Sequence, residues 1–204
     1  GGKFERKSIV GADSVYEEMG VLLFDADNDT DLDLYSVSGG SEQGKGSELY
    51  QDQLYLNDGK GVLMSAANTL PSIRQSGSCV VASDYDRDGD LDLFVGGRII
   101  PKEYPMPAGS FLLRNDSKPG ACRFTDVTQE VDGLQYIGLV TTALWSDYDN
   151  DGWVDLIVAG EFMPLTFYHN KNGKLVNATD ETELENTSGW WNSLAGGDFD
   201  GDGD

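Results

Sequence analysis

Residues 84–92 read DYDRDGDLD, and this acidic pattern occurs four times along the chain. The other copies are DADNDTDLD at 25–33, DYDNDGWVD at 147–155 and DFDGDGD at 198–204, the last of which is incomplete. Aspartates at alternate positions of a tight turn bring hard oxygen ligands to one point, and calcium accepts about six to eight such ligands in a loose geometry. The repeat therefore predicts a recurring calcium-binding loop.

The position of a residue within each loop predicts its role. Side chains at positions one, three, five and nine are expected to coordinate the ion, and position seven to offer its backbone carbonyl. Glycine at position six permits the sharp turn, and Thr30 replaces it in the first loop. The predicted ligands are Asp25, Asp27, Asp29, Asp31 and Asp33 in the first loop; Asp84, Asp86, Asp88, Asp90 and Asp92 in the second; Asp147, Asp149, Asp151, Trp153 and Asp155 in the third; and Asp198, Asp200, Asp202 and Asp204 in the fourth, which lacks position nine.

An EF-hand loop begins with the same D-x-D-x-D-G, but it requires a glutamate at position twelve and flanking helices. Position twelve here is Ser36, Val95 or Val158. Apolar residues at positions eight and ten flank the ninth aspartate in each complete loop, an alternation typical of a half-buried strand. The EF-hand is therefore excluded.

The starts of the four loops lie 59, 63 and 51 residues apart, a spacing typical of a fold built from one repeated unit. Each unit is predicted to contain a strand, the acidic loop, a strand, a connection, a strand, an Asn-rich turn and a strand. No helical periodicity of any length is present. The predicted fold is all-β, a β-propeller of four-stranded antiparallel blades, with repeat units at 1–59, 60–119, 120–171 and 172–204, the last truncated.

The two ends of an up-and-down blade carry alternate connections. The acidic loops are therefore expected at the same rim as the Asn-rich turns at 57–59, 115–117 and 170–173. The longer connections at 39–50 and 98–110 are expected at the opposite rim, with the stretches between blades. Loops of variable length gathered on one rim are a typical place for a binding site.

The repeated loop at this spacing resembles the FG-GAP/VCBS repeats that build the calcium-loop β-propeller of integrin α subunits. The segments CRFTDVT, KLVNATDET and GWWNSLAGGDFDGDGD are similar to those of bacterial VCBS proteins related to cartilage acidic protein and the ASPIC/UnbV group. The resemblance covers nearly the whole chain. It implies a propeller, commonly of seven blades, on an extracellular, periplasmic or cell-surface protein, with calcium in a structural role.

The length of the chain accounts for only part of such a ring. At roughly 60 residues per blade, the chain holds about three and a half blades, whereas propellers contain about four to eight. The chain is therefore expected to be a fragment of a longer ring. Uncovered blade faces would expose apolar residues, so self-association of the fragment is expected.

The composition is strongly acidic, with a net charge of −22, and half of the 36 Asp and Glu residues lie in the four loops. The charge stays negative even with every loop filled, which argues against nucleic acid and anionic membranes as partners. No apolar stretch approaches the roughly 18 residues of a membrane span, so membrane insertion is not expected. Motifs of the G-x-S-x-G, P-loop and H-E-x-x-H types are absent, and the single histidine, His169, is expected to be structural.

Two classes of function remain open. The first is a noncatalytic, calcium-stabilised binding or adhesion module of an exported protein, which recognises a protein or glycan through the rim opposite the loops. The second is part of a secreted or periplasmic propeller enzyme, such as a polysaccharide lyase. The lack of an acid–base pair outside the loops favours the first. Candidate contact residues on the far rim are Arg98, Glu161, Trp190 and Trp191, for which blade packing and an Arg98–Glu161 ion pair are the alternatives.

Overall fold

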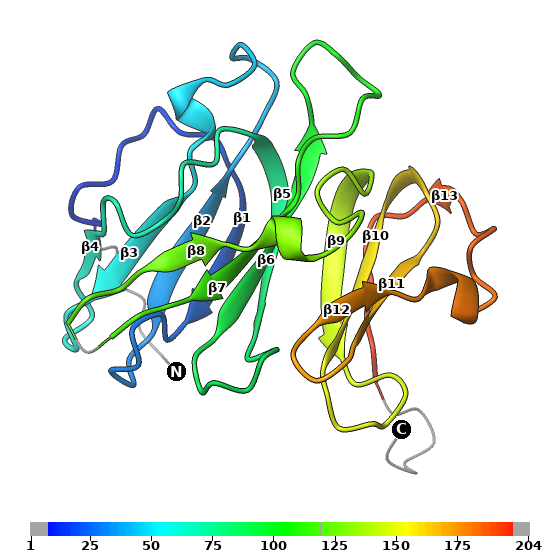
Figure 1. Ribbon diagram of the computed structural model, residues 1–204. Coiled ribbons are helices and arrows are strands. Elements are labelled where there is room, and N and C mark those ends of the chain that lie inside the picture. The colour runs from blue at the N-terminus through cyan, green and yellow to red at the C-terminus, as the bar shows by residue number, and fades with distance from the viewer. Residues whose placement is uncertain (1–7, 119, 198–204) are drawn as a thin grey trace, which may run out of the picture.

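The computed structural model describes residues 8–118 and 120–197, which form three antiparallel sheets side by side in an open arc (Figure 1). In each sheet the first four strands follow one another in chain order, so every sheet is an up-and-down blade. The first sheet contains β1 (Glu18–Phe24), β2 (Asp33–Ser38), β3 (Gln53–Asn57) and β4 (Leu63–Ser65). The second contains β5 (Ser76–Ser83), β6 (Asp92–Ile99), β7 (Phe111–Asn115) and β8 (Phe124–Asp126). The third contains β9 (Leu139–Ser146), β10 (Asp155–Met163), β11 (Thr166–Asn170) and β12 (Leu175–Asn177).

Little else in the described chain is regular. A fifth strand, β13 (Gly189–Trp190), pairs with the end of β10 in the third sheet. The helical turns are η1 (Glu48–Tyr50), η2 (Thr128–Glu130) and η3 (Thr179–Glu181), and no helix among the described residues is long and apolar enough to cross a membrane. The prediction of an all-β fold built from four-stranded antiparallel blades is confirmed, and the described strands form part of a propeller rather than a closed ring.

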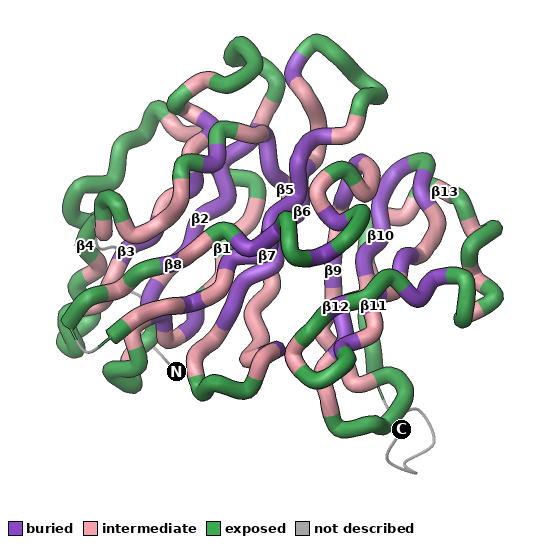
Figure 2. The backbone as a smooth tube through the Cα atoms, in the orientation of Figure 1, coloured by how far each residue is buried: buried purple, intermediate pink, exposed green. Residues whose placement is uncertain are grey.

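The core of the molecule lies between the sheets. The alternation of side chains along β6 sends Leu93 and Val95 toward the first sheet and Phe94 toward the third, so both faces of the middle sheet are buried (Figure 2). The second and third sheets approach each other closely near their upper ends, where a Cβ added to Gly96 of β6 would lie 2.6 Å from Val140 Cγ1 of β9. This packing fixes the position of each acidic loop relative to the next.

The predicted division of loops between the two rims is also confirmed. The acidic loops lie at the lower rim in Figure 1, where the Asn57 side chain donates to the carbonyl of Leu32 over 3.1 Å. At the upper rim, the long connection of the second sheet meets the next inter-blade stretch, because Ser110 N donates to Gln135 O over 2.7 Å. The metal loops and the variable loops are therefore at opposite ends of the blades.

The predicted repeat boundaries at 59/60, 119/120 and 171/172 each fall between the third and fourth strands of a sheet. A sequence unit with these boundaries carries the fourth strand of one sheet and the first three strands of the next. Residues 1–7, 119 and 198–204 lie outside the described part of the chain. The predicted fourth loop, with Asp198, Asp200, Asp202 and Asp204, is among them.

Candidate metal centres

The three described acidic loops close with the same local hydrogen bonds. The carboxylate at position one accepts a hydrogen bond from the backbone N–H at position six, and the carboxylate at position five accepts one from position seven. The first distance is 2.9, 3.2 and 2.9 Å in the first, second and third loops. The second is 3.0, 3.0 and 2.7 Å. The shared acidic pattern therefore specifies one turn, repeated in each blade.

This turn requires a left-handed backbone at two positions. Position four has φ values of 61°, 63° and 58° at Asn28, Arg87 and Asn150. Position six has φ values of 100° and 91° at Gly89 and Gly152, as the glycines predict, and 75° at Thr30. A β-branched residue in this region is strained. The substitution of threonine for glycine therefore costs the first loop conformational energy.

The aspartate at position nine connects each loop to its sheet. Asp33, Asp92 and Asp155 are at most 1% exposed. In each, one carboxylate oxygen accepts the backbone N–H of the asparagine that ends the third strand, over 2.8, 2.8 and 2.7 Å. Sequence reasoning predicted a ligand at position nine but missed this second role. The asparagine that ends each third strand was the available signal.

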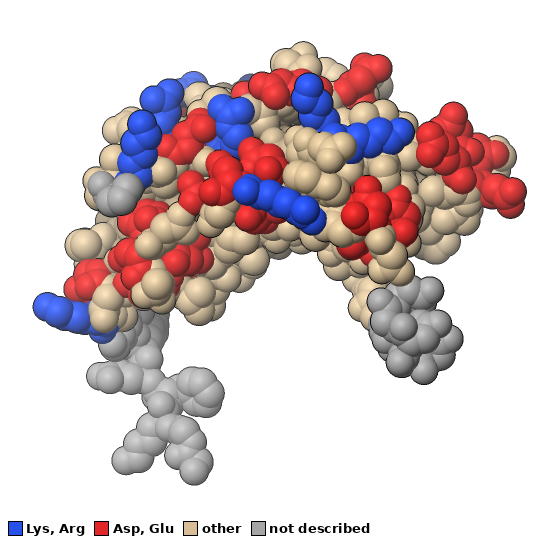
Figure 3. All heavy atoms as spheres, turned by 60° about the horizontal axis from the view of Figure 1, so that its bottom comes forward, with Lys and Arg blue, Asp and Glu red and all other residues tan. Residues whose placement is uncertain are grey.

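The loops bring carboxylates together in groups that could hold a cation. Ligand atoms within 4.8 Å of one another come from positions one, three and five in the first and third loops, and from one, three and nine in the second. Figure 3 shows acidic side chains in separate groups on this side of the molecule, with Lys and Arg between them. The sets of ligand atoms that lie within 4.8 Å of one another belong to Asp25, Asp27 and Asp29; Asp84, Asp86 and Asp92; and Asp147, Asp149 and Asp151. Most of the side chains that the sequence predicts as ligands therefore lie close enough to one another to share a cation.

The first two loops contain buried carboxylate oxygens without a hydrogen-bond donor in the described structure. They are Asp27 Oδ1, Asp31 Oδ1, Asp84 Oδ1 and Asp92 Oδ2. A buried carboxylate oxygen without a partner is costly, and a divalent cation would satisfy several of them at once. Burial raises the pKa of Asp92 to about 8, and burial together with the neighbouring aspartates raises the pKa of Asp27. The donor set, all oxygen and largely anionic, fits a hard cation such as calcium.

The third loop has an additional neighbour, the imidazole of His169 on β11. Its Nδ1 lies 2.9 Å from Asp149 Oδ2 and 3.5 Å from Asp155 Oδ1, and these ligand atoms form a fourth cluster. The ring of Tyr148 packs edge-on against the imidazole, with centroids 6.3 Å apart. The sequence predicted a structural role for His169, and the imidazole also contacts the carboxylates of the third loop. Its place one residue before Asn170, which is bonded to position nine, brings the imidazole beside the loop.

A family model for FG-GAP-like repeats matches residues 25–95 and 147–204. The two matched segments begin at the first aspartates of the first and third loops. The chain belongs to the FG-GAP-like repeat family. It is also 28% identical over 171 residues to cartilage acidic protein 1 of Xenopus tropicalis, a match that covers 81% of this chain and 25% of the relative. The chain thus spans about a quarter of the length of that curated relative.

On the rim opposite the loops of this FG-GAP-like protein, Arg98 and Glu161 form an ion pair between the second and third sheets. Glu161 is only 3% exposed, and it also accepts a hydrogen bond of 3.1 Å from the Tyr104 hydroxyl. Both charged candidates are therefore engaged with each other. Their contact is the inter-blade ion pair that the sequence left open as an alternative.

The two adjacent tryptophans have different surroundings. Trp190 is 57% exposed and packs edge-on against Phe162, with ring centroids 5.1 Å apart. Phe162 in turn contacts the ring of Tyr104, with centroids 6.3 Å apart, so three aromatic rings form a continuous exposed surface. Trp191 is half-buried, and its indole Nε1 donates to Thr187 O over 3.1 Å. Trp190 therefore lies in an exposed aromatic surface, and Trp191 supports the local fold.

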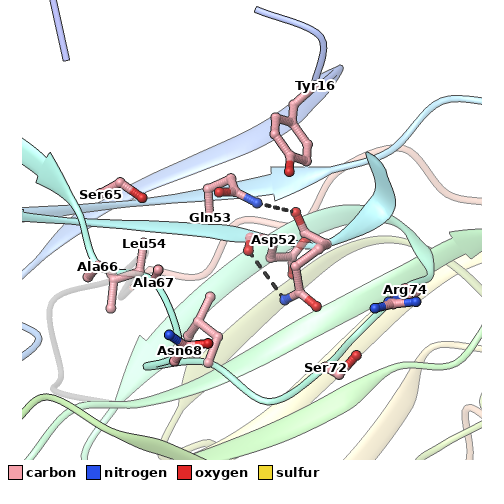
Figure 4. A pocket seen from close by; sticks show the side chains of 12 residues that line it. Tyr16, Asp52, Gln53, Leu54, Ser65, Ala66, Ala67, Asn68, Ser72 and Arg74 are labelled. Carbon is pink, nitrogen blue, oxygen red and sulfur yellow. Dashed lines mark hydrogen bonds between the residues drawn. The ribbon is translucent and has the colours of Figure 1, made fainter. Parts of the chain in front are cut away.

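A cavity of about 390 Å³ lies between the first sheet and the connection to β5 (Figure 4). Its lining is mainly polar and uncharged, with the amides of Gln51, Gln53 and Asn68. The carboxylate of Asp52 accepts hydrogen bonds from the Tyr35 hydroxyl at 2.7 Å and the backbone N–H of Ser38 at 2.8 Å, both within the first sheet. The acidic lining residue, Asp52, is therefore held by groups of its own sheet, and the basic one is Arg74.

Proposed function

We propose that the chain is part of a calcium-stabilised, noncatalytic binding or adhesion module of an exported protein. In this proposal each loop binds one calcium ion, which removes the repulsion between its carboxylates and holds the loop against the third strand of its blade. The rim opposite the loops contacts a protein or glycan partner.

The observation that carries the calcium role is the set of buried, unpartnered carboxylate oxygens in the first two loops. They occur in loops with the same turn, on the same rim, in a chain with a net charge of −22. Two unit charges about 4 Å apart repel by about 1 to 4 kcal/mol in partly solvated surroundings. A cation among them would therefore stabilise the folded protein considerably.

The exposed aromatic surface supports the binding role. Tyr104, Phe162 and Trp190 are 53%, 56% and 57% exposed, although each is a large ring in contact with another. Connected exposed aromatic rings are typical of sites that bind proteins or sugars. The ion pair between Arg98 and the buried Glu161, which also accepts the Tyr104 hydroxyl, fixes the two blades at this point. The surface is thus held rigidly before a partner arrives, which lowers the cost of binding.

Export is supported by the name of the relative, a cartilage protein, and by calcium itself, which is abundant outside the cytosol. The alternative of a polysaccharide lyase would need an acid–base pair free to act in a cavity, and the Asp52 carboxylate that lines the cavity of Figure 4 is held by Tyr35 and Ser38. Self-association of the chain is a further proposal, supported by Met19, Val21 and Leu23. These alternate residues of β1 are 47%, 64% and 58% exposed on one side of the first sheet.

Thermal unfolding in 1 mM calcium and in excess chelator tests the calcium role. One site filled at about one hundred times its Kd adds about 2.7 kcal/mol, which raises the Tm of a chain of this size by about 5 to 10 °C. An equal Tm in both buffers would contradict the proposal. The rim is tested separately on immobilised glycans and proteins, with Trp190→Ala as the variant and Val62→Ala, an exposed apolar residue at the loop rim, as the control.

A further inference from the structure

The side chain at position four of one loop contacts the following loop of the next blade. The amide of Asn28 in the first loop donates to Asp90 in the second. The guanidinium of Arg87 in the second loop donates to the carbonyl of Gly152 in the third. It also lies over the ring of Trp153, 4.0 Å from the ring centroid. The same relation, from position four to position six or seven, thus occurs at both described junctions between blades.

The conformation of the second loop controls the direction in which Arg87 points. Position four is left-handed, with φ of 63° at Arg87, and this conformation belongs to the closed turn. The turn closes when the carboxylate of Asp84 accepts the N–H of Gly89. A cation bound by the second loop would hold this turn closed. Arg87 would then be fixed in the direction of the third loop.

The part of the third loop that Arg87 contacts is the part that carries a predicted ligand. The peptide between Gly152 and Trp153 offers its carbonyl to Arg87 and its N–H to Asp151 Oδ1, over 2.7 Å. Trp153 occupies position seven, whose backbone carbonyl is expected to face the cation. By holding the preceding peptide and the indole ring, Arg87 restricts the orientation of that carbonyl.

A second set of contacts links the same loops in the opposite direction. The side chain of Asn170, whose N–H bonds the third loop's Asp155, donates to the carbonyl of Tyr85 in the second loop over 2.7 Å. Asn115 makes the equivalent bond to Ala26 in the first loop, over 3.1 Å. At both described junctions, neighbouring loops are therefore connected by contacts in both directions.

We propose that consecutive metal loops are energetically coupled, and that Arg87 is a positioning residue through which cation binding at the second loop strengthens binding at the third. This inference rests on the proposed metal role of the loops. A cation at the second loop orders Arg87, so the third loop has less disorder to lose when its own cation binds. Charge alone would act in the opposite sense, because a guanidinium beside a cation site repels the cation.

The test is a Tb³⁺ titration in which tryptophan is excited and the sensitised emission of the bound ion is recorded. Trp153 lies within the third loop but also against Arg87 of the second loop. The emission of the third site is therefore the part that Asp147→Asn, which disables the third loop, removes. Asp84→Asn disables the second loop. Third-loop affinity is then measured in the wild type, Asp84→Asn, Arg87→Ala and the double variant, as a double-mutant cycle.

We expect Asp84→Asn to weaken the third site by about fivefold when Arg87 is present, and to have little effect in the Arg87→Ala background. Arg87→Ala alone should also weaken the third site, and Arg87→Lys should restore only part of the loss, because lysine has no planar group to cover the indole. Arg74→Ala removes the same charge far from the loops and should leave the affinity unchanged.

Equal effects of Asp84→Asn in the two backgrounds would overturn the coupling. A tighter third site in Arg87→Ala would also overturn it, because charge would then be the only role of the guanidinium. The absence of sensitised emission in the wild type would contradict metal binding by the third loop itself. That result is distinguishable from a failure of coupling, in which emission appears but the cycle is additive.

Discussion

The second and third acidic loops have the same turn but different surroundings. In the second, Asp84 Oδ1 and Asp92 Oδ2 are buried without a donor. In the third, both oxygens of Asp155 accept backbone N–H groups, and the imidazole of His169 lies 2.9 Å from Asp149. The carboxylates of the third loop therefore have more protein partners than those of the second, in which Asp92 accepts a backbone N–H at one oxygen only.

The difference shows that the loop motif and its neighbours control separate properties. The motif specifies the backbone, because its hydrogen bonds connect residues only two to five positions apart. The neighbours, which come from β11 and from the adjacent blade, control how much a cation would add. We therefore expect the second loop to gain more from calcium than the third.

The largest effect is expected from neutralising position one in each loop. Asp84→Asn should lower the free energy of unfolding in calcium by about 2 to 3 kcal/mol, because the second loop loses its cation. Asp147→Asn, the matched change in the third loop, should cost less. Chemical denaturation in calcium and in chelator gives both values.

The same variants have a built-in control in chelator. Without a cation, Asp84→Asn removes a repelling charge and should leave the stability unchanged or raise it, so the sign of its effect depends on calcium. If Asp84→Asn and Asp147→Asn lower the free energy of unfolding in calcium by the same amount, the different surroundings of the second and third loops have no energetic consequence.

Asp52, a buried carboxylate outside any loop, provides a reference for the two loop variants, Asp84→Asn and Asp147→Asn. Burial raises the pKa of Asp52 to about 7, so the folded protein retains a proton that the unfolded chain releases near pH 4. Stability therefore falls as the pH rises through this window. Asp52→Asn should remove this fall, a relative gain of about 2 kcal/mol between pH 5 and pH 8.

Urea denaturation of the wild type and Asp52→Asn at several pH values measures this gain. The gain should be the same in calcium and in chelator, because Asp52 contacts Tyr35 and Ser38 rather than a loop. A gain that disappears in calcium would show that the pH dependence belongs to the metal loops instead.

The sequence was sufficient for the features that depend on short-range order. The acidic repeat predicted the turn, and its spacing predicted the blades and the rim on which the loops lie. Leu93 and Leu156, apolar residues that follow the ninth aspartates, are fully buried as the strand alternation implies. These features follow from hydrogen bonds and burial within one blade, which a single repeat unit encodes.

The features that the sequence did not reveal depend on contacts between distant residues. His169 reaches the third loop from β11, and Arg87 reaches Gly152 from another blade. Leu56 and Arg114 occupy the strand position of His169 in the other blades, so the repeat itself gives no reason for an imidazole there. Such contacts require the relative placement of strands and blades, which spacing alone does not provide.

A smaller effect is expected at position six, where the first loop differs from the other two. Thr30→Gly should raise the free energy of unfolding by about 1 kcal/mol, because glycine adopts the left-handed backbone without strain. The matched change, Gly89→Ala, should cost about 1 kcal/mol. A Cβ on Gly89 would have no heavy atom within 4 Å, so the cost is conformational. Chemical denaturation in chelator measures this conformational free energy without the contribution of calcium. A Thr30→Gly variant less stable than the wild type would contradict backbone strain at Thr30.

The smallest expected effect concerns the imidazole itself. His169→Leu gives the third blade the residue that the first blade carries at Leu56, and should cost about 0.5 kcal/mol in chelator, the order of one polar side-chain contact. In calcium the cost should shrink, because the cation compensates Asp149 in place of the imidazole. The variant would therefore make the third loop gain more from calcium, as the second does.

Denaturation in both buffers measures this, and Leu56→His is the reciprocal control, expected to lower the calcium gain of the first loop. A calcium-dependent gain that His169→Leu leaves unchanged would mean that His169 only packs against the loop, and that the two loops differ for another reason.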